Sequence, residues 1–505
     1  MSEWKSVFDA NISLYVRIIV EHLLNNGWQM ISINDYTRNM PSFSCMDALK
    51  TNDYQKEGLF PIVSQSKDLI SGYTDNKQLV NKIDSPIIIF GDHTQVVKYI
   101  DFDFVLGADG TKILTVSKDY LPKFLYYIIK SIDLHSNKYA RHYSKLRKEK
   151  IPYCKDSINI QEKIVAFLDS LAENAIEEKN YFDKIIESKI ISLQKECLNI
   201  CLIEKENEKQ KSYAKQLRQN ILQEAIEGKL TADWRKQHSI QKGNPDYDAE
   251  ALFEQIQKEK YHTDLFAPNG AHAKKAKSVS SEPIRVTKKE KSLPPITEDE
   301  IPFEIPTGWK WVRLGEIVEN ITSGSREWAK YYSDTGAIFL RMGNLSRESY
   351  ELRLDNIQHV RVPESSEGKR TRLLPFDLLF SITAEIGNLG LIPKDFPEAY
   401  INQHTARIRF AQLVKQSLYF ANALLAPGIR KLYLPNAHGM KNSFRLDTLS
   451  FIPIPLPPLA EQKEIVTRVE QHLQTITQLE TQIATRETST KQLMQSILKD
   501  VFEKE

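Results

Sequence analysis

The sequence repeats itself over a long distance. Three short motifs in its first part return in its second part, in the same order. Such self-similarity is the sequence signature of a duplicated architecture. The chain is therefore predicted to contain two copies of one plan, each with a globular part headed by Gly-Trp and followed by a long helix. The paired motifs are Gly27–Trp28 with Gly308–Trp309, Gln161–Val165 with Gln462–Val466, and Lys215–Leu222 with Lys491–Leu498.

Length and composition exclude several classes of protein. A chain of 505 residues is too long for one hydrophobic core. No N-terminal apolar run qualifies as a signal peptide or membrane span, because residues 12–24 are interrupted by charges. A net charge of +2 argues against indiscriminate binding of polyanions but allows basic side chains to gather on particular faces. Four cysteines without zinc-site or secreted-framework spacing fit a reducing, cytoplasmic location.

Short apolar runs beside glycines predict strands in both globular parts. In the first copy, Ile87–Phe90 is predicted to be a buried strand, and Phe104–Leu106 and Thr111–Leu114 a pair of strands around a turn. A helix is predicted over Leu121–Ile132. In the second copy, Pro306–Leu314 is predicted to be a turn that leads into an alternating strand, and further strands are predicted at Ala337–Leu340, Leu378–Phe380 and Ala406–Phe410.

Two long helices are predicted from apolar residues spaced three and four apart, at Asn159–Gly228, with possible breaks near Cys201–Lys211, and at Glu461–Phe502. Each stripe needs burial, so the helices are expected to pair. Phe451–Pro458 is expected to be an irregular extended strap, because prolines remove backbone donors. Residues 273–295 have the composition of an exposed tether. The predicted stripe of the second helix is Val469, His472, Ile476, Leu479, Ile483, Leu493, Ile497 and Val501.

Three longer motifs resemble the specificity (S) subunit of type I restriction-modification systems. They are Ile305–Ile317, Ile452–Val466 and Leu217–Arg235, while the first copy's exit at Ile151–Ile158 lacks the proline-rich strap. The resemblance implies two globular target recognition domains of α/β (α+β) class. It also implies that the long helices separating them form an antiparallel coiled coil, in a pseudo-twofold duplicated architecture.

The expected organisation has six parts. They are an N-terminal helical segment at 1–26, target recognition domain 1 at 27–157, a central long helix at 158–235, a connector at 236–304, target recognition domain 2 at 305–456 and a C-terminal long helix at 457–505.

Polar and basic side chains on loops at strand ends are the candidates for reading DNA. Phosphate contacts position a protein on DNA, and contacts to base edges specify sequence. Any one of these loops could equally be a solvated turn. Because such loops occur at strand ends in both copies, together they favour a role in reading DNA. The first-copy candidates are Ser64, Gln65, Ser66, His93, Thr94, Lys112, Arg141, Lys145 and Arg147. The second-copy candidates are Ser325, Arg326, Arg341, Asn344, Arg347, Thr383, Asn388, Gln403, His404, Asn436, His438 and Lys441.

The sequence carries no phosphate-binding glycine loop, zinc-protease motif or nucleophile elbow. Asn244–Tyr247 is one residue away from the Asn-Pro-Pro-Tyr signature of DNA adenine methyltransferases, but a turn in a polar connector is favoured. Asp92–His93 and His404 are interpreted as hydrogen-bonded loop residues rather than metal ligands. Two other functions stay open: a self-contained methyltransferase or nuclease, and a coiled-coil scaffold that does not bind DNA.

The family resemblance implies a non-catalytic subunit that reads an asymmetric, bipartite site in double-stranded DNA. Its expected partners are two methyltransferase subunits and the restriction/translocase subunits of a phage-defence enzyme, with no membrane. S-adenosylmethionine, ATP and magnesium are expected on those partners, and no cofactor on this chain.

Overall fold

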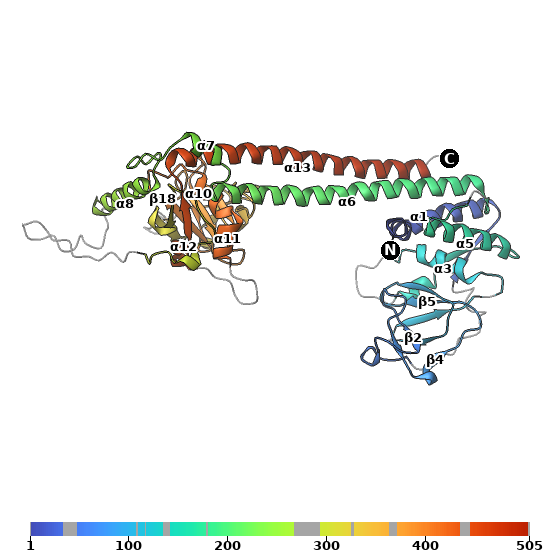
Figure 1. Cartoon of the computed structure of the whole chain (residues 1–505). Coiled ribbons are helices and arrows are strands. Elements are labelled where there is room, and N and C mark those ends of the chain that lie inside the picture. The colour runs from blue at the N-terminus through green and yellow to red at the C-terminus, as the bar shows by residue number, and fades with distance from the viewer. Residues whose placement is uncertain are drawn as a thin grey trace, which may run out of the picture. The chain divides into compact units, whose positions relative to one another are not determined.

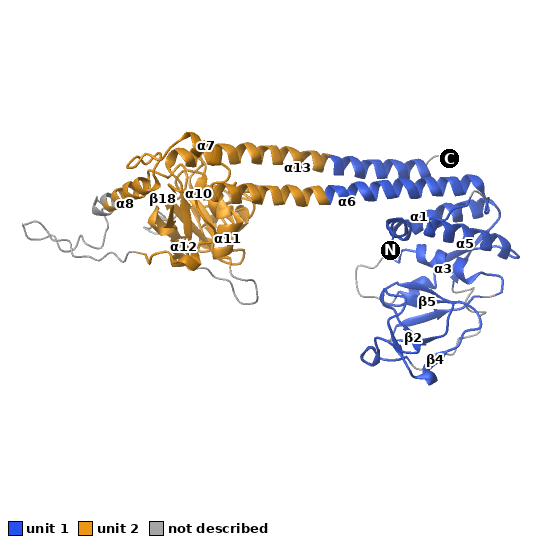
Figure 2. Cartoon of the chain, in the orientation of Figure 1, with its two compact units in different colours: residues 1–208, 486–505 blue, residues 209–485 orange. Residues whose placement is uncertain are grey.

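The structure is a computed structural model that describes residues 2–33, 48–107, 110–116, 118–134, 142–177, 180–266, 293–324, 328–362, 371–434 and 445–502. The chain divides into two compact units (Figure 2). Unit 1 comprises residues 1–208 and 486–505, and unit 2 comprises residues 209–485. The long helices α6 (Lys184–Ile226) and α13 (Leu459–Phe502) each contribute one part to either unit (Figure 1).

Unit 1 has a layer of helices, α1, α3 and α5, which pack on one another, and two small sheets. The strand orders are β6-β5-β8 and β3-β2-β7-β4, and β1 and β9 form a separate pair. The elements are α1 (Glu3–Asn25), β1 (Gln29–Ser32), β2 (Phe60–Val63), β3 (Gly72–Thr74), β4 (Val80–Asn81), β5 (Ile87–Gly91), β6 (Val97–Ile100), β7 (Phe104–Leu106), β8 (Thr111–Leu114), α3 (Pro122–Ser131), α4 (Tyr143–Leu146), β9 (Lys150–Tyr153) and α5 (Ile158–Glu173).

Strand β5 joins the layers of unit 1. All five of its residues are buried. Successive side chains of a strand point to opposite faces, so Ile88 and Phe90 pack with the helices, whereas Ile87 and Ile89 pack with residues of the other sheet. A strand buried on both faces shows no polar alternation. The uninterrupted apolar run therefore correctly predicted a buried strand.

Unit 2 contains two four-stranded sheets, ordered β11-β18-β15-β16 and β12-β14-β13-β17, and the pair β10-β19. Its elements, besides parts of α6 and α13, are α7 (Ala232–Gln237), α8 (Ala249–Phe266), β10 (Lys310–Arg313), β11 (Val318–Ser323), β12 (Tyr332–Ser333), β13 (Ala337–Leu340), β14 (Gln358–Val360), β15 (Leu378–Ser381), β16 (Leu389–Leu391), β17 (Ala399–Ile401), β18 (Thr405–Phe410), α10 (Tyr419–Leu425), α11 (Pro427–Tyr433), α12 (Leu446–Phe451) and β19 (Pro453–Leu456).

The two units share the central part of their strand topology. In unit 1, β5 pairs antiparallel with β6 and β8, and β2 runs parallel to β7. In unit 2, β15 pairs antiparallel with β16 and β18, and β13 runs parallel to β17. The pair β1-β9 likewise has its counterpart in β10-β19. This correspondence confirms the prediction of two mixed α/β copies.

One predicted strand pairing is wrong. Strands β7 and β8 form at the predicted residues, but they belong to different sheets. β7 lies between β2 and β4, so both of its edges are already paired, and β8 pairs with β5 instead. The chain therefore passes from one sheet to the other between β7 and β8.

The proline-rich segment is also more regular than predicted. Pro453–Leu456 forms β19, which pairs antiparallel with β10. The Leu314 N–H donates to the Ile452 carbonyl at 2.9 Å, and hydrogen-bonded positions alternate in such a pair. Ile454 and Leu456 therefore take the bonded positions, while Pro453 and Pro455 take the positions that need no donor.

The first long helix is broken at a different place from the one predicted. Its first part, α5, ends where Asn174 adopts a left-handed conformation with φ of 56°, and α6 starts afresh at Lys184. The Asp183 carboxylate accepts from the Ile185 and Ile186 N–H groups at 2.9 and 3.0 Å and caps the new helix. From Lys184 to Ile226 the helix is continuous, so the breaks expected near Cys201–Lys211 are absent.

The helices α6 and α13 pair antiparallel, as predicted. In unit 2, Arg218 forms an ion pair with Glu480, and Arg468 donates to the Leu230 carbonyl just beyond α6. In unit 1, the Lys189 ammonium donates to the carbonyl of Val501 at 2.7 Å. Figure 1 shows the two helices side by side.

The buried stripe of α13 differs from the predicted one at alternate positions. Val469, Ile476 and Ile483 are buried as predicted, but Leu479 is 44% exposed and Leu493 is 49% exposed. The half-buried positions lie one residue later than predicted, at Leu473, Glu480 and Met494, while His472 is exposed. The predicted and observed stripes agree at every seventh residue, such as Val469, Ile476 and Ile483. Between those positions the prediction chose Leu479 and Leu493 because they are apolar, but the helix buries the residue after each of them more deeply.

The connector packs on unit 2 wherever the structure describes it. In α8, Leu252 and Ile256 are fully buried in the core of the unit. The Asn244–Tyr247 segment is a turn, as predicted: the Tyr247 N–H donates to the Asn244 carbonyl at 2.9 Å. The carbonyl of Pro245 accepts from the N–H of Leu459 at the start of α13. The turn thus caps a helix end.

Candidate nucleic-acid interface

Three loops meet in unit 1 at the ends of β2, β5 and β7. The Thr94 hydroxyl donates to the Gln65 carbonyl at 2.7 Å, and the His93 N–H donates to the Gln65 side-chain oxygen at 3.3 Å. The Asp92 N–H donates to the carbonyl of Gly110 at 2.8 Å. Gly110 has a φ of +86°, and a Cβ there would lie 2.8 Å from the His93 ring. The structure therefore brings Gln65, His93 and Thr94 together.

A fourth segment joins this cluster through Asp92, which is 5% exposed. Its carboxylate accepts from the Tyr143 N–H at 2.8 Å, and its carbonyl accepts from the His142 N–H at 2.9 Å. Burial raises the pKa of the Tyr143 hydroxyl, and the nearby Asp92 carboxylate raises it further, whereas Arg147 lowers it. Asp92 thus positions the loop, as expected of a hydrogen-bonded residue.

Basic side chains lie beside the cluster. The Lys112 ammonium lies 5.9 Å from the centre of the Tyr143 ring. Lys145, on α4, is half-buried, and Arg147 is exposed. Lys112 lies near the Tyr143 ring, and Lys145 and Arg147 come shortly after Tyr143 in the sequence. The three side chains could therefore place positive charge beside a bound phosphate.

The serines of the first loop are occupied by the fold. Ser64 is 5% exposed, and its hydroxyl shares a 2.7 Å hydrogen bond with the Ser71 hydroxyl. The Ser66 hydroxyl shares a 2.8 Å hydrogen bond with the same group. Both predicted residues therefore stabilise the turn after β2, and Gln65 between them is the one held beside His93.

The loop after Ser66 is held by a buried cation. Lys98 on β6 is 4% exposed, and its ammonium donates to the carbonyls of Asp68 and Leu69. Burial lowers the pKa of Lys98 to about 8, and Asp68 opposes this shift. Between pH 8 and the ordinary pKa of 10.5, the unfolded chain binds more protons than the folded chain.

The free energy of unfolding is therefore expected to rise as the pH increases through this window. We expect that rise to be smaller in a Lys98→Met variant, which has no ammonium to desolvate. Denaturant unfolding at about pH 7.5, 9 and 10 measures this rise, because these values run from just below the pKa of Lys98 in the folded chain to just below its ordinary pKa. An equal rise in the variant and the parent chain would contradict this cause.

In unit 2 the corresponding loops form a groove of about 510 Å³. It is lined by the segment after β13, by a second stretch of the same loop and by the turn between β17 and β18. Neither Arg341 nor Arg353 forms an ion pair with a described residue, so both guanidinium groups are available to a ligand. The lining residues are Arg341, Met342, Gly343, Asn344, Arg353, Asp355, Asn356, Asn402 and His404.

His404 is the centre of a polar cluster at this groove. Its Nδ1 lies 2.9 Å from the Thr383 hydroxyl, and its Nε2 lies 2.9 Å from the Gln403 amide nitrogen. The His404 N–H donates to the Asn402 side-chain oxygen at 3.1 Å. The structure thus assembles three predicted residues, Thr383, Gln403 and His404, from two loops.

Three other predicted residues have different positions. The Asn344 side chain is 3% exposed; it accepts from the Arg341 N–H and donates to the carbonyls of Arg353 and Asn356. Asn344 lines the groove, and its side-chain hydrogen bonds hold the loop that forms it. Asn388 is 4% exposed and donates to Glu385 at 2.9 Å. Arg347 lines a different pocket, beside α6 and α11.

Six predicted residues lie outside the described residues: Arg141, Ser325, Arg326, Asn436, His438 and Lys441. Conversely, the sequence analysis missed Arg353 and Asn356 in the groove. Their signal was weak, because they lie in a polar stretch without a neighbouring predicted strand. The sequence analysis also missed Asp92 as the residue that joins two loops.

Three tryptophans and one cysteine lie in or against the hydrophobic cores of the two units. Trp28 and Trp309 are 5% and 8% exposed, and Trp311 packs against the core of unit 2. Cys197 is buried in the core of unit 1. In the described stretches, no group of three or more His, Cys, Asp or Glu side chains could hold a metal ion. Those stretches also contain no helix long and apolar enough to cross a bilayer.

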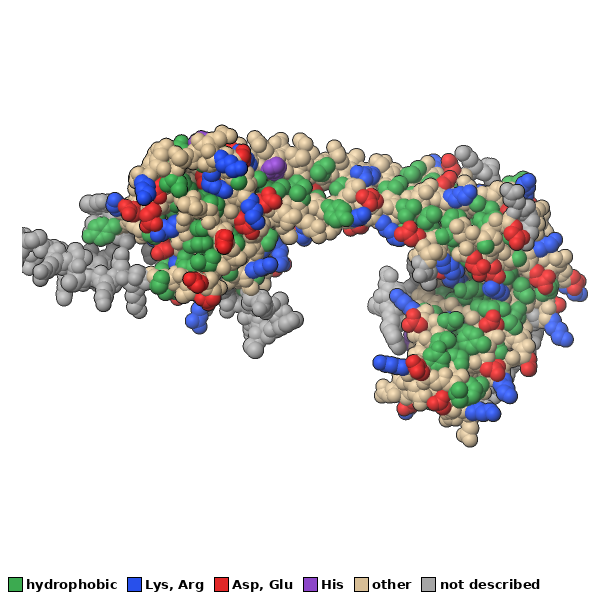
Figure 3. Space-filling model, in the orientation of Figure 1, with side chains coloured by type: hydrophobic (Ala, Val, Ile, Leu, Met, Phe, Trp, Pro, Cys, Tyr) green, Lys and Arg blue, Asp and Glu red, His purple; other side chains and the backbone are tan. Residues whose placement is uncertain are grey.

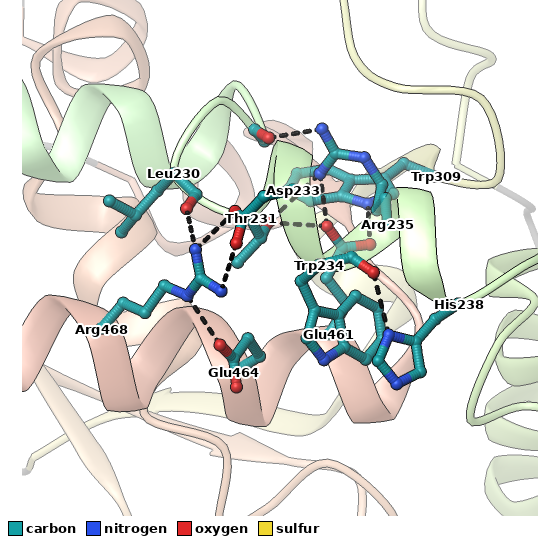
Figure 4. A network of polar contacts seen from close by, with 11 residues as sticks. Leu230, Thr231, Asp233, Trp234, Arg235, His238, Trp309, Glu461, Glu464 and Arg468 are labelled. Atoms are coloured by element: carbon teal, nitrogen blue, oxygen red, sulfur yellow. Dashed lines mark hydrogen bonds and ion pairs between the residues drawn. The ribbon is translucent and has the colours of Figure 1, made fainter.

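A polar network, which we call the Glu461 network, joins Trp309, just before β10, to α7 and α13 (Figure 4). The Glu461 carboxylate accepts from the Thr231 hydroxyl at 2.7 Å, from the Trp309 indole N–H at 2.7 Å, and from Arg235. Arg235 also donates to the Gly228 carbonyl at 2.5 Å. The network therefore positions the globular part that carries the groove.

Charge is not segregated on the face drawn in Figure 3, where basic and acidic side chains are interspersed among the described residues of both units. This agrees with the net charge of +2. Recognition by a few placed cations fits this surface better than a continuous basic face.

Comparisons with known proteins show which sequences and structures this chain is similar to. Residues 306–486 match the family model described as type I restriction modification DNA specificity domain. The specificity subunit of the type I restriction enzyme EcoAI from Escherichia coli is 28% identical over 276 residues, which are 52% of this chain and 40% of that protein. The EcoR124I/EcoR124II specificity subunit from Escherichia coli is 31% identical over 135 residues, 24% of this chain and 33% of that protein.

The chain is also similar, with low TM-scores, to solved structures of other proteins. An HsdS subunit from Thermoanaerobacter tengcongensis has a TM-score of 0.33 and 17% identity, covering 95% of this chain and 97% of that one. An S subunit from M. genitalium has a TM-score of 0.29 and 13% identity, covering 94% and 96%. The chain spans about two fifths or less of the length of the curated relatives it matches. Residues 306–486 thus resemble a type I restriction modification DNA specificity domain, and about half of the chain or less is similar in sequence to specificity subunits of type I restriction enzymes.

Proposed function

We propose that this chain is the DNA-recognition subunit of a type I restriction-modification complex, and that its two units read the two halves of an asymmetric site in double-stranded DNA. One observation carries the proposal: the units share a strand topology, but corresponding loops hold different polar side chains. Gln65 follows β2 where Arg341 follows β13, and His93 follows β5 where Thr383 follows β15. Two similar frames with unlike loops suit two unlike half-sites.

The side chains at these loops suit the contacts that DNA requires. Arginine can donate two hydrogen bonds to the O6 and N7 of guanine, and glutamine or asparagine can pair with adenine in the same way. Arg341 and Arg353 border the groove of unit 2, whereas Gln65 and His93 form the cluster of unit 1. We therefore assign base reading to these residues and phosphate contacts to Lys112, Lys145 and Arg147.

The chain itself is proposed to be non-catalytic. S-adenosylmethionine, ATP and magnesium would bind to partners, namely two methyltransferase subunits and the restriction/translocase subunits. Incubating the full chain alone with these cofactors and DNA should leave the DNA unchanged, and adding the partners should start methylation. Methyl transfer by the isolated chain would favour a self-contained enzyme, and a complex without sequence-specific DNA retention would favour a scaffold.

The experiment that tests the reading role is methylation mapping with an Arg341→Gln variant. Loss of a guanidinium at a base edge typically costs about 1–3 kcal/mol and relaxes specificity at one position. We expect relaxed sequence preference in one half-site and an unchanged other half.

Arg361→Gln is the matched control. Arg361 follows β14 in the same sheet and is exposed, but it does not line the groove. The control should keep the parent sequence preference. Changes in both half-sites of the Arg341→Gln variant would show that the units do not read independently.

A further inference from the structure

A small pocket in unit 2 concentrates positive charge away from the groove. It has a volume of about 180 Å³ and lies between α6, α11 and the loop after β13. Five basic side chains line it, and Glu348 is its single acidic lining residue. The basic residues are Lys215, Arg218, Arg347, Arg430 and Lys431.

Only two of these cations are neutralised by the described part of the protein. Lys215 pairs with Glu348 at 2.8 Å and holds the pKa of that carboxyl below its usual range. Arg218 pairs with Glu480 at 3.2 Å. Arg347, Arg430 and Lys431 form no ion pair with a described residue. The pocket therefore has three positive charges without an ion-pair partner among the described residues.

Arg430 is the most constrained of the three. One of its terminal nitrogens, Nη1, donates to the Arg347 carbonyl at 2.8 Å. Its Nε and Nη2 atoms are buried, and no described residue accepts from them. Burial lowers the pKa of this guanidinium. Buried donors without acceptors are rare and costly, and an arginine fork matches the paired oxygens of a phosphate.

We propose that this pocket binds a phosphate of the DNA backbone and so fixes the duplex on unit 2. The assignment rests on the proposed reading function and adds a subsite to it. It draws on a continuous loop: Arg341 and Arg353 border the reading groove, and Arg347, between them in sequence, borders the pocket. Phosphate contacts that flank base contacts set the register of a protein on DNA.

Salt dependence distinguishes such a contact from a base contact. Each phosphate neutralised contributes about 0.9 to the slope of log K against log salt concentration. We expect Arg430→Gln in the full chain to reduce this slope by about that amount. The affinity should fall by the same factor for DNA with the recognised sequence and for scrambled DNA, so sequence preference stays unchanged. Fluorescence anisotropy titrations over a range of salt concentrations measure both quantities.

Two further variants separate the charge from the fold. Lys431 is exposed, so Lys431→Gln should reduce the slope in the same direction without disturbing packing. Lys258→Gln removes one exposed charge from α8 in the same unit and should leave the slope unchanged. Thermal unfolding of each variant shows whether it retains the parent stability.

The outcomes separate the two proposals. If the parent chain retains its DNA specifically but both pocket variants keep the parent slope, the pocket assignment is wrong and the reading function stands. A loss confined to the recognised sequence would make Arg430 a base contact and overturn the assignment. If inorganic phosphate raises the melting temperature of the parent but not of Arg430→Gln, while the slopes agree, the pocket serves a free anion. If the parent retains no specific DNA, the reading function itself fails.

Discussion

Replacing Glu461 by alanine is expected to lower the free energy of unfolding of unit 2 by about 3–5 kcal/mol, the range for breaking a buried ion pair. Glu461 is 2% exposed, and its carboxylate is the shared acceptor of three groups. Without it, the Arg235 charge and the Trp309 indole N–H would be left desolvated without their acceptor. For a unit of this size the melting temperature should fall by roughly 6–20 °C.

Thermal and denaturant unfolding of the full chain, followed by tryptophan fluorescence, measure this effect. Glu464→Ala is the matched control, three residues further along α13. Glu464 pairs with Arg468 at 2.6 Å, but Arg468 keeps its bonds to Asp233 and to the Leu230 carbonyl. The control should change stability by about 0–1 kcal/mol. Equal losses in the two variants would show that Glu461 is no more than a surface ion pair.

A second large effect is expected at Ile476. This side chain is 1% exposed in the core that joins α13 to unit 2. Its replacement by alanine removes buried methyl and methylene groups and leaves a cavity, at a cost of roughly 2–5 kcal/mol. The denaturant midpoint of the unit 2 transition should fall accordingly.

Leu479, three residues later, supplies the comparison. It was predicted to share the buried stripe, yet it is 44% exposed. Leu479→Ala should change stability by about 0.5 kcal/mol or less. A loss at Leu479 as large as the loss at Ile476 would mean that Leu479 packs against another part of the protein in solution.

The sequence predicted features that depend on local pattern. The apolar run Ile87–Phe90 predicted a strand. The run has no polar residue because both faces of β5 are buried. The repeated motifs predicted two copies, and β1-β9 and β10-β19 indeed frame both units in the same way. The helix stop at Asn174 and the cap at Asp183 also have local signals, which the long periodic pattern concealed.

Candidate reading residues divide according to what their side chains contact. Loop position and polarity selected Gln65, His93 and Thr94, which do lie together, and equally Ser64 and Asn344, which are bonded within their own loops. Side-chain polarity alone does not separate the two groups. The difference is whether the side chain forms its hydrogen bonds within its own loop or lies against a neighbouring loop, and that depends on how the loops fold together.

By itself, the sequence determined the duplication, the identity of several strands and the heptad spacing, because each follows from propensity and periodicity over neighbouring residues. The tertiary structure alone decided which strands pair, which set of alternate positions α13 buries, and which cations lack an ion-pair partner among the described residues. Those outcomes depend on contacts between residues far apart in the chain. Arg430 and Lys431 are adjacent to Lys215 and Arg347 only in the folded unit, where burial and the positions of Glu348 and Glu480 determine which charges are neutralised.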